Sequence, residues 1–189
     1  MRKGRAIPEV LTPEEQARML GELEPTNSPG KLRNYAIIRL FLNTGLRAHE
    51  LAGLTLRNLD LSTGRVKVRG KGGKDRVLWL SDDDVALVRV WLEKRGPSGD
   101  LVFTSLDGKR PICQRWLRDM VKRVAVKAGI GKDIHPHTLR HTFATDLLRQ
   151  TKNLRLVQKA LGHANITTTT IYTHIVDEEL EEAFKELRR

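Results

Sequence analysis

Between Gly64 and Ser81 the hydrophobic pattern of the chain changes from a helical period to an alternating one. "GRVKVRG" and "DRVLWLS" are two short runs rich in strand-forming residues, the first alternating between charged and apolar residues, and "KGGK" separates them. Such alternation is typical of strands with one buried face, and a short connection that contains glycine favours a hairpin. We therefore expect a hairpin or a small antiparallel sheet at this point of the chain.

Helical signals dominate the first half outside this region. Thr12, Pro13 and Glu15 form the pattern of a capping box with proline at the first helical position. The segment "PTNSPGK" is expected to be a loop, and "KLRNYAIIRLFLNTG" a helix that stops at Gly45. Ser81 should cap "DDDVALVRVWLEKRG", whose acidic start and basic end suit the helix dipole.

The second half is expected to be almost wholly helical. After a strand or turn region in "DLVFTSLDGKRP", a long basic helix should run from Ile112 to Ala128. Helical patterns continue in "HTLRHTFATDLLRQ", "NLRLVQKALG" and "DEELEEAFKELRR". The predicted fold is thus mainly α with a small antiparallel β-sheet, an α+β class, and 189 residues suit one domain, alone or with a small appendage.

The charge of the chain points to a polyanionic partner. Lysine and arginine number 34 against 23 acidic residues, which gives a formal net charge of +11. Such an excess favours nucleic acid first and an anionic membrane surface second. A basic protein without any particular partner is the alternative that composition alone leaves open.

Several classes of protein are excluded. Cys113 is the only cysteine, so an intrachain disulfide and a zinc site built from several cysteines are both impossible, as suits a reducing cytosol. No apolar signal core follows Met1 to Val10, and the longest apolar run, "AIIRLFL", is short and contains Arg39. We expect a cytoplasmic protein without a membrane span.

The most unusual stretch is "HPHTLRHTFATDLL", from His135 to Leu148. In a helix, His137 and Arg140 share a face, and His141 lies one turn from His137. The metalloprotease pattern needs a glutamate directly after its first histidine, but Thr138 stands there. A zinc site completed by a distant third histidine and a phosphate-binding surface both remain open at this point.

Three further segments carry candidate groups. "RGKGGKDR" lacks the spacing and the following helix of a nucleotide-binding P-loop, so its lysines lie on a hairpin, either solvated or functional. Arg47, between Gly45 and a short helix in "AHELAGL", either pairs with Glu50 or points at an anion beside the helix N-terminus. In "LGHANITTTTIYTH", His163 follows a helix-ending glycine, and Tyr172 is either a packing residue or a reactive one.

Each of these signals is weak alone, but their order is specific. The segments "TGLRAHELAGL", "GKGGKDR", "HPHTLRHTFAT" and "LGHANITTTTIYTH" present Arg, Lys, His-x-x-Arg, His and Tyr in that order. From Thr44 to His174 the chain therefore resembles the catalytic domain of the tyrosine recombinases, also called the phage integrase family, and the Xer-type recombinases in particular. The resemblance implies the fold of that catalytic domain.

The resemblance also implies a role for each matching residue. Tyr172 would be the nucleophile that attacks a DNA phosphodiester, and the arginines would clamp the scissile phosphate. The histidines would complete the phosphate pocket and assist proton transfer. The hairpin lysine that protonates the leaving 5′ oxygen is Lys71, with Lys74 as the second choice. The implied catalytic set is Arg47, Lys71, His137, Arg140, His163 and Tyr172, supported by His141, Lys74 and Glu50, without a metal or another cofactor.

The resemblance implies double-stranded DNA as the partner. The chain would be a monomer in solution and would assemble on DNA, as a tetrameric synapse in this family. Backbone phosphates are expected to contact basic residues of the long helix, namely Arg115, Arg118, Lys122, Arg123 and Lys127, unless this is only a solvated helix face.

The expected organisation is a single catalytic domain over residues 1–189, without the separate N-terminal core-binding, SAM-like domain of the family. A C-terminal tail helix is expected over residues 177–189, with Leu180, Phe184 and Leu187 as its apolar stripe. Its sequence allows it to dock on its own domain or on a neighbour's, and the resemblance implies exchange between subunits. The expected function is site-specific recombination through a covalent 3′-phosphotyrosyl intermediate. A type IB topoisomerase-like nicking-closing enzyme and a non-catalytic DNA-binding regulator on the same fold are the alternatives.

Overall fold

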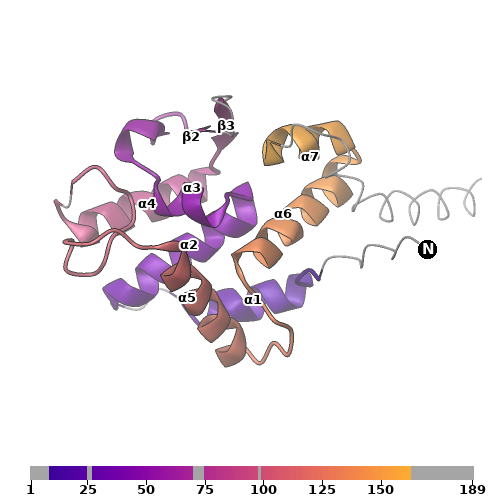
Figure 1. The fold of residues 1–189 in the computed structure, drawn as a ribbon, viewed down its shortest axis with the longest axis horizontal. Helices are drawn as coiled ribbons and strands as arrows, with labels where there is room; N and C mark the ends of the chain where they lie inside the picture. The colour runs from indigo at the N-terminus through magenta and orange to yellow at the C-terminus, as the bar shows by residue number, and fades with distance from the viewer. Residues whose placement is uncertain (1–8, 25–26, 70–74, 98, 163–189) are drawn as a thin grey trace, which may run out of the picture.

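The architecture was analysed in a computed structural model, which describes residues 9–24, 27–69, 75–97 and 99–162. Over these residues the chain is mostly helical, with a small sheet at one side of the molecule (Figure 1). In chain order the elements are α1 (Pro13–Gly21), α2 (Pro29–Thr44), α3 (Ala48–Ala52), the 3₁₀ turn η1 (Leu56–Asn58), β1 (Leu59–Asp60), β2 (Arg65–Arg69), β3 (Asp75–Trp79), α4 (Asp82–Arg95), α5 (Gln114–Lys127), α6 (Pro136–Thr151) and α7 (Leu154–Leu161). The predicted α+β class is confirmed.

The predicted hairpin is part of a three-stranded antiparallel sheet in the order β1-β2-β3. Val66 pairs with Leu78 and Val68 with Arg76, so these four residues share one face of the sheet. Val66, Val68 and Leu78 are buried on that face. The hairpin predicted from the alternating pattern is therefore confirmed, and the structure shows which residues face inward.

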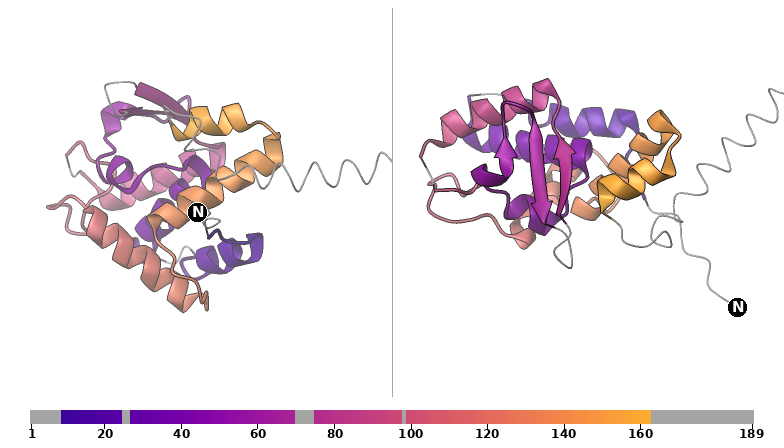
Figure 2. Two further views of the ribbon diagram at one scale, coloured as in Figure 1. Left: turned by 45° about the vertical axis from the view of Figure 1, so that its right-hand side comes forward. Right: turned by 90° about the horizontal axis from the view of Figure 1, so that it is seen from above.

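Helix α2 lies at the centre of the molecule. Its residues Ala36, Ile37, Ile38, Leu40 and Phe41 are all fully buried, and they form one hydrophobic cluster with residues of the sheet, α4 and α5. A second, smaller cluster joins α6 to α7 through the buried residues Ala144, Leu148, Val157 and Leu161. Figure 2 shows α7 beside the sheet, and α7 contacts β3. The end of the chain that the structure describes is thus held against the strands.

Most helix ends follow the sequence signals. Thr12 and Glu15 form the expected capping box, and Ser81 accepts a hydrogen bond from the Asp84 N–H. The loop predicted over "PTNSPGK" is wrong at its C-terminal end, because Ser28 caps α2 and Pro29 is its first residue. The long basic helix begins at Gln114 rather than Ile112, because Cys113 is its N-cap.

The region "DLVFTSLDGKRP" forms turns with two isolated bridges, Thr55 with Leu101 and Thr104 with Pro111. No helix within the described residues is both long and apolar enough to cross a lipid bilayer.

Candidate phosphate-binding site

The site begins at the turn between α2 and α3. Gly45 ends α2 with a φ of 60°, and its N–H donates to the Phe41 carbonyl at 3.0 Å. A Cβ atom at this position would lie 2.3 Å from Cδ1 of Phe143, so glycine is required by both backbone conformation and space. The turn places Arg47 at the N-cap of α3, with its side chain about a third exposed.

Glu50 holds Arg47 in place. Its carboxylate accepts the Arg47 backbone N–H at 2.7 Å and the Arg47 Nη1 at 3.0 Å. Of the two sequence interpretations of Arg47, the structure shows the pairing with Glu50. The pairing uses one guanidinium nitrogen and leaves 34% of the Arg47 side chain exposed, so it is compatible with binding an anion as well.

Arg76 is a member of the site that the sequence analysis missed. It lies on β3 and donates to both oxygens of Glu50, from Nη1 at 2.8 Å and from Nη2 at 2.7 Å. Its Nε donates to the Ala160 carbonyl of α7 at 3.1 Å. A signal was present in the sequence. Arg76 lies two residues before the buried Leu78 on the same strand, so the two side chains share the buried face of that strand, where a charged residue needs a partner.

The two arginines keep Glu50 ionised. Its side chain is 3% exposed, and burial by itself raises the pKa of a carboxyl. Hydrogen bonds from the Arg76 side chain and from the Arg47 N–H and guanidinium, together with the charge of Arg76, outweigh burial and hold the pKa of Glu50 at about 2, below an ordinary 4.5.

Helix α6 brings a second group of side chains to this turn. His135 caps the helix by accepting the Thr138 N–H on Nδ1 at 3.2 Å, and Pro136 is the first helical residue. Arg140 is only 3% exposed. Its Nη1 donates to the Gly45 carbonyl and its Nη2 to the Leu161 carbonyl, the latter at 2.6 Å. Arg140 therefore ties α6 to the turn before Arg47 and to the end of α7.

His137 lies one turn before His141 on α6, as predicted. Their ring centroids are 4.4 Å apart in an edge-to-face arrangement. Partial burial, together with the positive charges of Arg140, His135 and Arg47, lowers the pKa of His137 below 6.5. Because the charges of Arg47 and Arg140 both lower the pKa of His137, these three predicted residues lie in one positively charged region of the structure. Among the described residues, no three His, Cys, Asp or Glu side chains are grouped to hold a metal ion.

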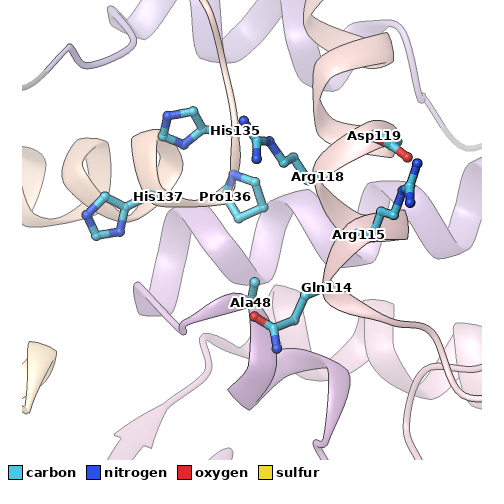
Figure 3. A pocket seen from close by; sticks show the side chains of 8 residues that line it. All are labelled: Ala48, Gln114, Arg115, Arg118, Asp119, His135, Pro136 and His137. Carbon is cyan, nitrogen blue, oxygen red and sulfur yellow. The ribbon is translucent and has the colours of Figure 1, made fainter.

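A cleft opens beside His137, between α5 and the start of α6 (Figure 3). Its volume is about 630 Å³. Arg115 and Arg118 of α5 line it, together with Ala48 of α3, which directly follows Arg47. The remaining lining residues are Gln114, Asp119, His135, Pro136 and His137. Arg115 and Arg118, two of the predicted DNA-contacting arginines, thus share a cleft with the catalytic candidate His137.

The other predicted DNA contacts are exposed on α5 but do not line this cleft. They are Lys122, Arg123 and Lys127. Lys122 lies 3.5 Å from the carboxylate of Asp133, and both side chains are well exposed. Lys71, Lys74, His163, Tyr172 and the predicted tail helix over 177–189 lie outside the described residues, which end at Gly162.

Comparison with known proteins places this geometry in a family. The model of the phage integrase family matches residues 9–179. The tyrosine recombinase XerC of Xanthomonas axonopodis pv. citri (strain 306) is 40% identical over 181 residues, which are 95% of this chain and 58% of that protein. XerC of Serratia marcescens is 41% identical over 177 residues, which cover 92% of this chain and 57% of that protein. The chain spans little more than half the length of these relatives.

Solved structures agree with the sequence relatives. The XerH site-specific recombinase, in a post-cleavage complex with a palindromic difH substrate, matches with a TM-score of 0.83 and 31% identity, over 100% of this chain and 56% of that one. The XerA recombinase matches with a TM-score of 0.82 and 33% identity, over 98% of this chain and 67% of that one. With the family model covering most of its length, this chain belongs to the phage integrase family.

Proposed function

We propose that this chain breaks and rejoins DNA at specific sites, with Tyr172 as the nucleophile. The observation that carries the proposal is the contact of Arg140 with the Gly45 carbonyl. It joins two segments 95 residues apart and brings the predicted arginines and His137 into one cationic site. A phosphodiester is the group that such a site suits best, because guanidinium forks match its two non-bridging oxygens.

In the proposed reaction the Tyr172 hydroxyl oxygen attacks the scissile phosphorus and loses its proton. The bond from phosphorus to the 5′ oxygen breaks, a 3′-phosphotyrosyl link forms, and Lys71 or Lys74 donates a proton to the leaving oxygen. Attack by a 5′ hydroxyl on the phosphotyrosine reverses these steps and rejoins a strand. Because the covalent link conserves the energy of the phosphodiester, religation needs no ATP.

Each group meets a physical requirement of this reaction. In-line attack builds negative charge on the non-bridging oxygens, and arginine stays charged at any working pH. A preorganised donor of this kind contributes on the order of 10²–10³ in rate. A phenol has an ordinary pKa of about 10, so it needs a base at neutral pH, and an imidazole with a lowered pKa is a competent one. His137 meets that description, because its pKa lies below 6.5.

The partner in this proposal is double-stranded DNA. XerC relatives and the XerH complexes with difH substrate support this choice, as does the net charge of +11. We propose that the strand next to the scissile phosphate runs through the cleft beside His137 and contacts Arg115 and Arg118. Lys122, Arg123 and Lys127 extend the same helix for further backbone contacts. The reaction would take place in the cytoplasm, where chromosomal or mobile DNA is accessible.

Assembly on DNA is proposed to depend on residues 177–189. Their acidic sequence and apolar stripe suit a helix that packs on a neighbouring subunit. Truncation after His174 is then expected to weaken the sedimentation of multimers with DNA more than the binding of one monomer. Equal loss of both would reject the exchange of this segment.

Covalent trapping tests the chemistry. The protein is mixed with labelled nicked duplexes that carry a randomised site, and SDS-resistant adducts are isolated and their modified residue is mapped. We expect a phosphotyrosine at Tyr172, no adduct with Tyr172→Phe, and an adduct with Tyr35→Phe, since Tyr35 is the only other tyrosine. DNA binding without any adduct would favour a non-catalytic regulator. Relaxation of supercoiled plasmids of any sequence, without exchange between sites, would favour the topoisomerase-like alternative.

A further inference from the structure

Three elements of the site meet at Arg76. The side chain is 9% exposed, and it reaches from β3 to Glu50 on α3 and to the Ala160 carbonyl on α7. Each of its three guanidinium nitrogens donates to a protein oxygen, at distances from 2.7 to 3.1 Å. Arg76 is therefore committed to the protein and not to a ligand.

The C-terminus of α7 receives two guanidinium groups. Arg76 donates to the Ala160 carbonyl and Arg140 to the Leu161 carbonyl, two consecutive residues. The last carbonyls of a helix lack partners within the helix, and its C-terminus attracts cations. Gly162 follows with a φ of 63°, and a Cβ atom there would lie 2.9 Å from Cδ of Arg76. The backbone is thus fixed at the residue directly before His163.

These contacts close a ring around the site. Arg47 binds Glu50, Glu50 binds Arg76, and Arg76 binds Ala160. The chain continues to Leu161, whose carbonyl binds Arg140, and Arg140 binds the Gly45 carbonyl two residues before Arg47. A displacement at one member of such a ring moves the next, so the orientation of Arg47 depends on Arg76 through Glu50.

We propose that Arg76 is a positioning residue for cleavage, an inference that rests on the proposed function. It aims the Arg47 guanidinium through Glu50, and it fixes the start of the segment that carries His163 through the Ala160 carbonyl. It does not touch the DNA. Lysine cannot replace it, because a single ammonium cannot reproduce a fork that spans both Glu50 oxygens while a third nitrogen reaches Ala160.

Cleavage by Arg76→Lys tests the proposal. At saturating DNA we expect the rate of adduct formation to fall on the order of 10²-fold, as when a reacting group is misplaced by about 1 Å. The Kd for DNA should stay within about threefold, because Arg76 is buried away from the ligand. In Arg76→Ala, millimolar guanidinium should restore part of the rate. Arg89→Lys is the matched control, since Arg89 also donates to a backbone carbonyl, that of Leu61 at 2.8 Å, but is exposed and lies on α4 rather than on β3.

A second readout separates this proposal from the proposed function. In protein labelled with 15N-arginine, the side-chain Nε–H signal of Arg47 should shift in Arg76→Lys and stay in place in Arg89→Lys. A wild type that forms no adduct, combined with this shift, would overturn the proposed function and leave the positioning role intact. If the wild type does form the adduct, two results would overturn the positioning role. One is cleavage by Arg76→Lys at the wild-type rate, and the other is an Arg47 signal that does not move in Arg76→Lys.

The link through Glu50 is tested by a double-mutant cycle. If Arg76 acts on Arg47 through this carboxylate, Arg76→Lys combined with Glu50→Gln should slow cleavage little more than either change alone. Rates are compared at a temperature at which thermal unfolding shows every variant to be fully folded. Effects that multiply would overturn the route through Glu50.

Discussion

Replacing Glu50 by glutamine removes one negative charge from the centre of the site and keeps the shape of the side chain. In the wild type this carboxylate is 3% exposed and accepts hydrogen bonds from Arg47 and Arg76. A glutamine has one acceptor oxygen and one NH₂ group, and that NH₂ would face a guanidinium N–H. The change therefore leaves two cations close together with their shared counterion gone.

The expected loss of stability follows from the pKa of Glu50. A pKa of about 2 instead of 4.5, at about 1.4 kcal/mol for each unit, corresponds to roughly 3 kcal/mol in favour of the folded state. Breaking one side of a buried ion pair costs about 3–5 kcal/mol in other proteins, which agrees. Because the folded pKa lies below the unfolded one, this stabilisation is complete above pH 4.5 and disappears as the pH falls toward 2.

Urea unfolding, followed by tryptophan fluorescence, measures the difference between wild type and Glu50→Gln at several pH values. We expect about 3 kcal/mol at pH 7, the same at pH 5.5, and a smaller difference at pH 3.5. The exposed Glu93 on α4 provides the control, and Glu93→Gln should change the free energy of unfolding by less than about 0.5 kcal/mol. A difference below about 1 kcal/mol at pH 7, or one that stays constant down to pH 3.5, would refute the reasoning.

Three other measurements probe the surroundings of the site. Gly45→Ala should cost about 2–4 kcal/mol in urea unfolding, because alanine disfavours a φ of 60° and its Cβ would overlap Phe143; a neutral effect would contradict both requirements. NMR titration of His137 should give a pKa below 6.5. The free energy of unfolding of the wild type should then fall relative to that of His137→Asn as the pH falls from 6.5 toward 5, and an equal difference between the two proteins at pH 7.5 and pH 5 would count against this. Asp84→Asn should cost about 3 kcal/mol, because the fully buried Asp84 carboxylate lies 2.8 Å from Arg39; less than about 1 kcal/mol in the same assay would show that the pair contributes little.

The sequence predicted the elements of the fold because its local signals agree with the tertiary structure. The alternation over "GRVKVRG" and "DRVLWLS" predicted both strands of the hairpin, and their register came from the structure. The capping residues Thr12 and Ser81 gave the starts of α1 and α4. The start of α2 was missed because Ser28 and Pro29, read as loop residues, are also the residues that begin a helix. Serine and proline are common both in loops and at the first positions of helices, and only the hydrophobic spacing of the residues that follow distinguishes the two cases.

The candidate site was predicted in part. The spacing of His137 and Arg140 followed from helix geometry, and the family motif supplied Arg47. Local patterns could not show that Arg140 would be buried against the Gly45 and Leu161 carbonyls, because those contacts span 95 and 21 residues. Arg76 was missed for the same reason, since its partners are 26 and 84 residues away. Hydrogen bonds between polar groups far apart in the chain produce no periodic pattern in the sequence. The one local indication is a charged residue at a position where the strand faces the core.

The ring of contacts also explains how a cationic site can exist before its ligand arrives. Arg47 and Arg76 share the carboxylate of Glu50, and Arg140 donates to the Gly45 carbonyl, so these four side chains together carry two positive charges. The Gly45 and Leu161 carbonyls accept hydrogen bonds from Arg140 and orient its guanidinium. More carboxylates would stabilise the free protein, but they would also cancel the charge that a phosphate is to meet. The Glu50 carboxylate orients both Arg47 and Arg76, and under the proposed function the remaining positive charge of these four groups is available to a phosphodiester.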